Sequence, residues 1–302
     1  MPTLQDYRRA TARTIGTLEI GTASSGSGTG VGQVTITSHP FKSSILSDHL
    51  KDKWLHRPER TLAADADRIC ATHTPTTGVL TNDLDWSDDP DGEVIEAMSP
   101  VSGTDLNRYC NDGLKRVFSV EEFSFVVSDT DENRHNLTAT ADWLENGDHV
   151  YQVGTLNTTT DDRDEVNPFD RIVWGRTETN AGKVWLIGPR FSTSQTIYVK
   201  CIRSHYSLCR ASGGTFGDQD GLTNEDDESA ATLDQVRWAA KWVYLEEFMA
   251  QEPNEKARQI IEKDIARTLV HLNVACKRTG FALPRRTLIA PANMAATAGG
   301  NW

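Results

Sequence analysis

The sequence predicts an α+β fold, in which a helical bundle carries an inserted antiparallel β-sandwich or barrel-like region and an extended C-terminal arm. Three observations predict this fold. Apolar residues recur at helical spacing near the N-terminus, over 104–117 and over 232–279. Short strand-like runs, divided by turn residues, fill most of the chain between these helices. The tail after residue 281 has no regular period. We expect the helical bundle to consist of residues 1–20, 101–120 and 229–281.

Composition limits the classes of function. The chain has 302 residues, of which 37% are apolar and 25% charged, as in globular proteins. Its 31 basic and 43 acidic residues give a formal net charge of −12. Sequence-independent DNA binding needs the opposite sign, because it depends on neutralising phosphates. No apolar run reaches the roughly 18 residues of a membrane span, and the first residues do not read as a secretory signal.

The first helix is expected to begin after a Thr3 cap and to end near Gly16. One stripe of this helix is expected to consist of Leu4, Tyr7, Thr11, Thr14 and Leu18, which recur at helical spacing. The Gly- and Ser-rich stretch 22–30 is interpreted as a hairpin tip or linker, because it lacks the GK[ST] ending of a phosphate-binding loop.

Residues 21–100 form the first expected β-rich, turn-rich region, with a strand at Val31–Thr37. Several aspartates surround its turn at Asp89–Gly92: Asp83, Asp85, Asp88, Asp89 and Asp91. A calcium loop would need an uninterrupted spacing of ligands, which Pro90 breaks. We therefore interpret this cluster as a solvated turn and predict no metal site.

The second helix is expected to begin at Thr104 and to continue to Val117, with Asp105 at the positive end of its dipole. Residues 121–212 then form the second expected region, an antiparallel β domain. After an alternating run at Phe123, Phe125 and Val127, its candidate strands are Leu137–Trp143, Val150–Val153, Asp170–Gly175, Lys183–Ile187 and Thr196–Ile202.

An acidic loop is expected at 213–228, before two long helices that Pro253 and Asn254 separate. The first of these helices has Leu233, Val236, Ala240, Val243, Tyr244 and Phe248 on one face, and Trp238 and Trp242 on an adjoining face. The second is expected to turn Ala257, Ile260, Ile261, Leu269, Leu272 and Cys276 inward. The pair is either a buried hairpin or a subunit interface, with Trp238, Trp242, Tyr244 and Phe248 as the interface candidates.

Residues 282–302 are expected to form an extended arm with two prolines and many small residues. The arm is either a floppy terminus or a segment that docks onto a partner. Its apolar and basic residues are the docking candidates: Arg285, Arg286, Leu288, Ile289, Met294 and Trp302.

Catalytic and cofactor sites are not predicted. The five cysteines are widely spread and are interpreted as buried thiols. Ser204-His205-Tyr206-Ser207 is the nearest approach to a nucleophile and base, but we expect a strand there, which would place neighbouring side chains on opposite faces. No GxSxG elbow occurs. A glycosidase stays an alternative, because its two carboxylates need only meet in space.

The order of these parts resembles the head-to-tail connector, or adaptor, proteins of tailed bacteriophages. The resembling segments span most of the chain. They are Leu4-Gln-Asp-Tyr-Arg-Arg-Ala-Thr-Ala-Arg, Leu106-Asn-Arg-Tyr-Cys-Asn-Asp-Gly-Leu-Lys-Arg-Val, Trp143-Leu144, Leu186-Ile-Gly-Pro-Arg-Phe, and the acidic Leu222–Glu228 leading into Val236-Arg-Trp-Ala-Ala-Lys-Trp.

The resemblance implies a non-enzymatic structural protein of the virion neck, assembled in the host cytoplasm. Copies would form a ring, expected to be dodecameric, below the portal protein. The ring would line the channel through which genomic DNA passes without sequence-specific binding, and would contact downstream tail, stopper or nozzle proteins. The C-terminal segment would dock onto the portal, which gives 285–302 a role. The chain is longer than the smallest adaptors, and its β regions are expected to be additions that contact tail or fibre proteins.

An alternative class is a peripheral tail or baseplate protein with a carbohydrate-binding β-sandwich. Trp174 and Trp185 would then be stacking platforms for sugars, unless they are core residues. A glycan-binding screen separates the two classes.

Overall fold

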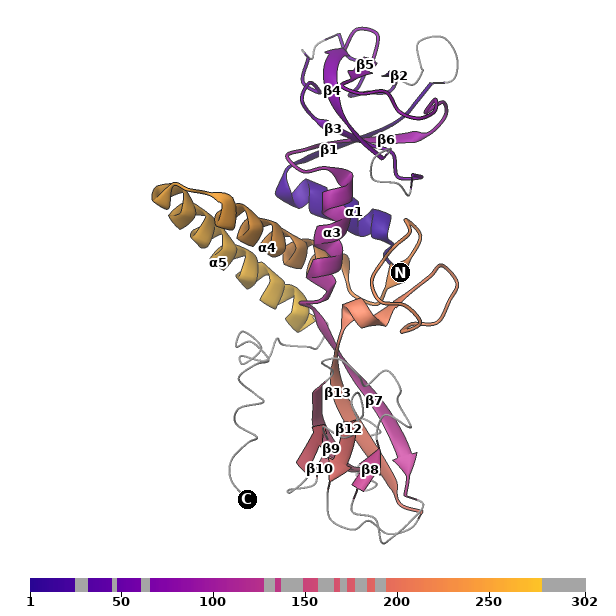
Figure 1. Cartoon of the computed structure of the whole chain (residues 1–302), viewed down its shortest axis with the longest axis vertical. Helices are drawn as coiled ribbons and strands as arrows, with labels where there is room; N and C mark the ends of the chain where they lie inside the picture. The colour runs from indigo at the N-terminus through magenta and orange to yellow at the C-terminus, as the bar shows by residue number, and fades with distance from the viewer. Residues whose placement is uncertain are drawn as a thin grey trace. The chain divides into compact units, whose positions relative to one another are not determined.

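The protein is an α+β protein, as the sequence predicts, and Figure 1 labels its helices and antiparallel strands. The computed structural model describes residues 1–24, 32–44, 48–60, 66–127 and 194–278, and between these the backbone of strands at 134–136, 149–156, 166–168, 173–176 and 184–187. The chain divides into two compact units. Unit 1 consists of residues 1–117 and 208–302, and unit 2 consists of residues 118–207.

The helices of unit 1 are α1 (Leu4–Ile15), α3 (Gly103–Leu114), α4 (Leu233–Gln251) and α5 (Glu255–Arg278). Thr3 caps α1 as predicted, and its hydroxyl accepts a hydrogen bond from the Asp6 backbone N–H. Thr232 caps α4 in the same way. The prediction that Leu18 continues the stripe of α1 was wrong. The helix ends at Ile15, and Leu18 lies in the following strand, β1.

Helix α4 contacts all three of the other helices, and α1 also packs on α3. The contact between α3 and α4 is close at Gly113, where an added Cβ would lie 2.9 Å from the Ala240 backbone nitrogen. A side chain at this position would force the two helices apart. Within the described residues, none of the helices combines the length and the apolar content that a membrane span needs.

A six-stranded antiparallel sheet lies between α1 and α3 in the sequence, in the order β1-β6-β3-β4-β5-β2. Its strands are β1 (Thr17–Thr22), β2 (Gln33–Thr35), β3 (Trp54–His56), β4 (Asp67–Thr74), β5 (Val79–Asn82) and β6 (Val94–Ser99). The chain leaves α1 through β1 and reaches α3 through β6, and these two strands pair along their length from Thr17 with Ser99 to Thr22 with Val94. The sheet is therefore an insertion whose two ends lie side by side.

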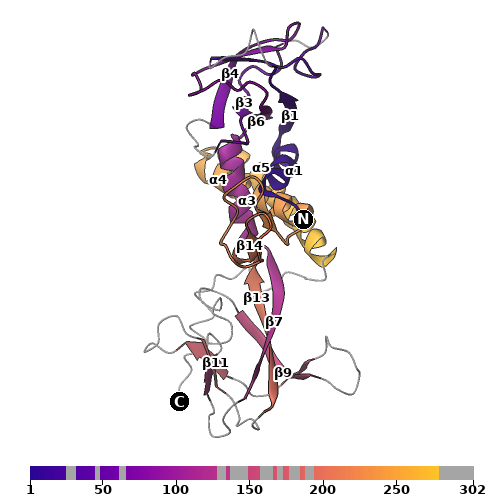
Figure 2. The same cartoon turned by 90° about the vertical axis from the view of Figure 1, so that its right-hand side faces the viewer.

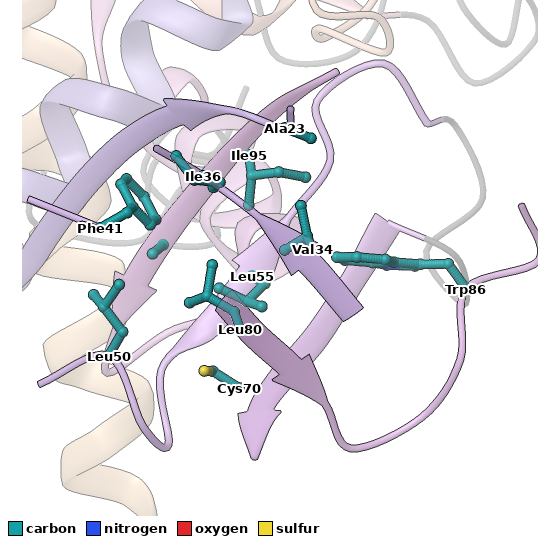
Figure 3. Close-up of a cluster of buried hydrophobic side chains, with 11 residues drawn as sticks. Ala23, Val34, Ile36, Phe41, Leu50, Leu55, Cys70, Leu80, Trp86 and Ile95 are labelled. Atoms are coloured by element: carbon teal, nitrogen blue, oxygen red, sulfur yellow. The ribbon is translucent and has the colours of Figure 1, made fainter. Parts of the chain in front are cut away.

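This sheet curls around its own hydrophobic core (Figure 3). The core side chains come from strands and loops alike: Ala23, Val34, Ile36, Phe41, Leu50, Leu55, Cys70, Leu80, Trp86, Ile95 and Ala97. The Ser24 N–H donates to the Thr35 carbonyl at 2.8 Å, which brings the two edge strands β1 and β2 together. No ladder pairs these edges within the described residues, so the predicted barrel-like region is an open sheet here.

Unit 2 begins and ends on paired strands. The strand β7 (Phe118–Val126) pairs with β13 (Thr196–Ser204) over its full length, so that Phe118 lies opposite Ser204 (Figure 2). Every second residue of β13 is buried, as expected for a half-buried strand. The sheet order is β10-β9-β13-β7, with β9 at His149–Leu156 and β10 at Val166–Pro168.

A second sheet in unit 2 has the order β11-β12-β8, with bounds Val173–Arg176, Val184–Ile187 and Arg134–Asn136. No strand described in unit 2 closes either sheet into a barrel. The candidate strand Leu137–Trp143 lies outside the described residues.

One local prediction was wrong. Residues His205–Leu208 form a short 3₁₀ helix instead of continuing the strand β13. The predicted acidic loop 213–228 consists mainly of turns and bends, and the short strands β14 (Cys209–Arg210) and β15 (Glu228–Ser229) pair across its base. The segment is also bound to the helices: the Leu4 N–H donates to the Asp227 carbonyl at 3.0 Å, and the Leu222 N–H donates to Asn111 Oδ1 at 2.7 Å.

Candidate interaction surface

A buried charged cluster joins α1 to β6 and to the acidic segment. Arg8 Nε donates to Glu96 Oε2 at 2.8 Å, and Arg8 Nη1 donates to Glu225 Oε1 at 2.5 Å. Arg9 Nε donates to the second oxygen of Glu96 at 2.6 Å. The side chains of Arg8 and Glu96 are fully buried. Because each charge has its partner inside the protein, the cluster fixes α1 against the sheet.

The protonation of this cluster is strongly biased toward the charged forms. Burial alone would lower the pKa of Arg8, but the carboxylates of Glu96 and Glu225 outweigh burial and raise it. Burial alone would raise the pKa of Glu96, but the Arg8 guanidinium, with smaller contributions from His56 and Arg9, outweighs burial and lowers the pKa. Both groups therefore keep their charges at neutral pH.

A second junction holds the N-terminus of α3. The Asp67 carboxylate accepts hydrogen bonds from the Gly103 N–H at 3.1 Å and the Thr104 N–H at 3.0 Å. His56 Nδ1 lies 2.8 Å from the same carboxylate, and its ring packs against Gly103. Burial alone would raise the pKa of Asp67, but the contact with His56 and the hydrogen bonds from Thr104 together outweigh burial and lower it. This pair of residues is a helix anchor, because both side chains are buried and the Asp67 carboxylate accepts from two backbone N–H groups at the start of α3.

The predicted aspartate turn has a structural role in the sheet of unit 1. Asp88 accepts from Arg57 Nη1 at 2.8 Å, and Glu93 accepts from Arg57 Nε at 2.7 Å. Arg60 contacts the same two carboxylates. Arg57 also lies over the Trp86 ring, at 5.2 Å from its centroid. Asp88 is therefore bound to arginines, whereas the prediction treated the whole cluster as solvated.

The candidate interface tryptophans of α4 are covered by cationic side chains of the same chain. The Arg116 guanidinium lies 4.2 Å from the Trp242 ring centroid, and Arg237 lies 5.3 Å from that of Trp238. His271 of α5 stacks on Trp238 with centroids 4.4 Å apart. Both tryptophans also pack against the buried cluster of Val117, Ala239, Leu272 and Cys276. Both tryptophan rings therefore make these contacts within unit 1.

The other two candidates form an aromatic row that reaches solvent. Tyr244 meets Tyr109 of α3 edge-on at 5.9 Å and stacks on Phe248 at 6.0 Å. Phe248 is 45% exposed. Beside this row, Arg108 forms a two-pronged ion pair with Glu247, with nitrogen–oxygen distances of 2.9 and 3.2 Å. Of the four interface candidates, Phe248 is the one that the structure leaves most accessible.

Helix α5 has two stripes at heptad-like spacing, on opposite faces. The inward stripe packs on α4 and includes the buried residues Ile261, Thr268, Leu272 and Ala275. The outer stripe consists of residues that are all exposed: Ile260, Lys263, Arg267, Val270, Val274 and Lys277. We call these six residues the α5 stripe. They recur three and four positions apart, so they lie along one face of the helix.

The α5 stripe corrects the sequence interpretation of this helix. Ile260 was predicted to point inward, but it is 68% exposed, whereas its neighbour Ile261 is 7% exposed. Val270 and Val274 are 63% and 44% exposed and were not singled out. Their spacing from Ile260 is the signal that could have revealed a second apolar stripe.

The side chains that come nearest to reactive groups in the sequence, the cysteines and His205, are buried. All five cysteines are buried thiols, and burial raises the pKa of Cys70, Cys110 and Cys209 to about 12. Burial lowers the pKa of His205 to about 4. Among the described residues, no group of three or more His, Cys, Asp or Glu side chains could hold a metal ion.

Several sequence candidates stay predictions. The docking candidates Arg285, Arg286, Leu288, Ile289, Met294 and Trp302 lie outside the described residues. Trp174 pairs in register with Leu186, and Trp185 pairs with Gly175. The side chains of these two tryptophans also lie outside the described residues.

Comparison of this chain with protein-family models, with curated proteins and with solved structures gives no match.

Proposed function

We propose that this protein is a structural subunit of a virion neck, a head-to-tail connector that forms a ring below the portal and lines the DNA channel. The observation that supports the proposal best is the α5 stripe. A long helix that packs on one neighbour and exposes three large apolar residues on its other face is typical of a subunit interface. No described residue of the chain packs on that face closely enough to bury it.

The finer architecture belongs to the same proposal. The four helices are the bundle that forms the body of the ring, and the two sheets of unit 2 pack as a β-sandwich. The chain enters and leaves each β region through paired strands, β1 with β6 and β7 with β13. Additions attached in this way leave the helical frame continuous, so they are suited to contact tail or fibre proteins without changing the ring.

The negative charge of the protein favours a role in lining a DNA channel over a role in binding DNA. The formal net charge of −12 repels phosphates, and the buried arginines Arg8 and Arg57 are already paired with carboxylates. DNA can pass a repelling wall without being held by it. In the proposal the protein has no catalytic step, and the segment containing Arg285–Trp302 docks onto the portal.

The test is a binding experiment with purified protein and portal assemblies from the same genome, imaged by electron microscopy. The expected result is a closed ring on the portal, which the resemblance leads us to expect as dodecameric. A protein that leaves portals bare at all concentrations contradicts the proposal, and would favour a peripheral tail or sugar-binding protein.

Two variants test the role of the tail. Deletion of residues 282–302 is expected to abolish portal binding while the far-UV circular dichroism stays that of the full chain. A second variant keeps the length of the chain and reverses two charges, Arg285→Glu with Arg286→Glu. If these two arginines bind the portal, this variant also loses portal binding. A truncated protein that binds portals normally removes the role given to the tail.

A further inference from the structure

We propose that the α5 stripe docks onto the acidic segment of a second copy of this chain, on the surface formed by Phe216, Asp218, Asp220 and Asp226. The contact is heterologous, because two different surfaces of the protein meet. This inference rests on the proposed ring, and it names the two surfaces that join neighbouring copies.

The α5 stripe alternates apolar and basic residues. Ile260, Val270 and Val274 provide the apolar contacts, and Lys263, Arg267 and Lys277 lie between and beside them. Lys263 and Arg267 form no ion pair with any residue that the structure describes. The helix as a whole is basic on an acidic protein: Lys256, Arg258, Lys263, Arg267, Lys277 and Arg278 outnumber Glu255, Glu262 and Asp264. Asp264 is moreover bound to Lys241 of α4 at 3.3 Å.

The acidic segment has the opposite character. Residues 218–228 contain six carboxylates and no basic residue. Glu225, Asp227 and Glu228 are used inside the chain, by Arg8, by backbone N–H groups and by Arg210. Asp218, Asp220 and Asp226 are exposed, and none of them forms an ion pair within the described part of the chain. Phe216, half-buried beneath Arg210, adds an apolar contact beside them.

Charge excludes the simplest alternative, a two-fold contact of α5 with α5. Such a contact would place one basic stripe against another, and like charges across an interface cost several kcal/mol. The acidic segment packs on α1 and α3, whereas α5 packs on α4. Figure 1 accordingly shows α5 and the segment around β14 and β15 on different sides of α3. Surfaces on different sides of one unit can join successive copies head to tail and close a ring.

The test is a charge exchange between two full-length variants. One variant carries Lys263→Glu and Arg267→Glu, and the other carries Asp220→Lys and Asp226→Lys. Each variant alone is expected to self-associate at least about 100-fold more weakly than the wild type, because like charges then face each other. An equimolar mixture is expected to recover association near that of the wild type, since every contact in an alternating assembly pairs opposite charges. Sedimentation velocity over a range of concentrations measures all three.

The matched control carries Arg13→Glu and Lys51→Glu. These two exposed residues lie outside both surfaces, and their substitution changes the net charge as the α5 variant does. It is expected to associate like the wild type. Loss of association in the control, or a mixture that stays as weak as its components, overturns the inference.

Site-specific crosslinking gives a second measurement, which also reports weak contacts. The native thiols are buried, so Val270→Cys in one population and Asp226→Cys in another are the reactive cysteines. A short bifunctional maleimide is expected to link copies in the mixture and not in either population alone. Links within the Val270→Cys population indicate a two-fold contact instead. If the thiol of Val270→Cys reacts only after residues 279–302 are deleted, the tail covers the α5 stripe. Either result overturns the inference.

These outcomes are separable from the portal test. If the wild type forms rings on portals and both charge variants associate normally, the proposed function stands and the proposed contact is overturned. If association depends on these charges but the protein does not bind portals, the proposed contact stands and the proposed function is overturned.

Discussion

Helices α3 and α5 are both amphipathic helices of unit 1, but their environments differ. The N-terminus of α3 is held by Asp67, and its Gly113 lies against the backbone of α4. Helix α5 packs on α4 through one stripe and exposes the other. The comparison teaches that the region around α1, α3 and the sheet is fixed by buried charges and close packing, whereas α5 has an accessible face that can bind a partner.

The largest expected difference is between the buried ion pair that joins α1 to β6 and the exposed ion pair that joins α3 to α4. Glu96→Gln removes a buried charge that Arg8 needs, so we expect the free energy of unfolding to fall by about 3–5 kcal/mol. Glu247→Gln breaks the exposed pair with Arg108 and is expected to cost less than about 1 kcal/mol. Urea unfolding at neutral pH measures both. Equal effects of the two substitutions would show that the cluster around Arg8 does not fix α1.

The two adjacent isoleucines of α5 test the difference between a buried and an exposed face within one helix. Ile261→Ala leaves a cavity against α4 and is expected to cost about 2–4 kcal/mol. Ile260→Ala removes an exposed side chain and is expected to change the free energy of unfolding by less than about 0.5 kcal/mol. The measurement is the urea midpoint of the isolated chain at low concentration. If Ile260→Ala is the more harmful of the two, the assignment of the faces of α5 is wrong.

The smallest effect is the pH dependence of the α3 anchor. The folded pKa of Asp67 is below its ordinary value of 3.8, so its contribution is present above that pH and is lost as the pH falls through the folded pKa. Asp67→Asn is expected to cost about 1–2 kcal/mol at pH 7, as for the loss of a helix cap. The difference between wild type and variant should narrow below about pH 4.

Asp112→Asn is the matched control for the anchor, because Asp112 forms a surface pair with Lys115 on the same helix. Its effect should stay below about 1 kcal/mol at every pH. Urea unfolding at several pH values between 7 and 3 gives the comparison. A difference for Asp67→Asn that grows toward low pH would reverse the sign expected for a lowered pKa.

Elements with strong local signals were predictable from the sequence. The cap at Thr3 places a hydroxyl before a helical stripe, and the break at Pro253 separates α4 from α5, because proline lacks the N–H that a helix needs. The alternation of Ile197, Val199 and Cys201 gives β13. The short strands β14 and β15 were missed, since two residues each give no period to detect.

The candidate surface was only partly predictable, for a different reason. The sequence shows that α4 and α5 carry more apolar residues than one contact can bury. It does not show which of them another helix covers. Trp238 and Trp242 were the most prominent residues, but Arg116 lies over Trp242 and His271 stacks on Trp238, and both of these residues come from positions that are distant in the sequence.

The α+β class, the positions of the long helices and the acidic balance of charge could be predicted, because they follow from local propensity, periodicity and composition. The burial of Ile261 and the exposure of Ile260 could not, because they depend on how the helices pack. Neighbouring residues of a helix point about 100° apart. Either isoleucine could therefore have met α4, and the choice depends on the direction from which α4 packs.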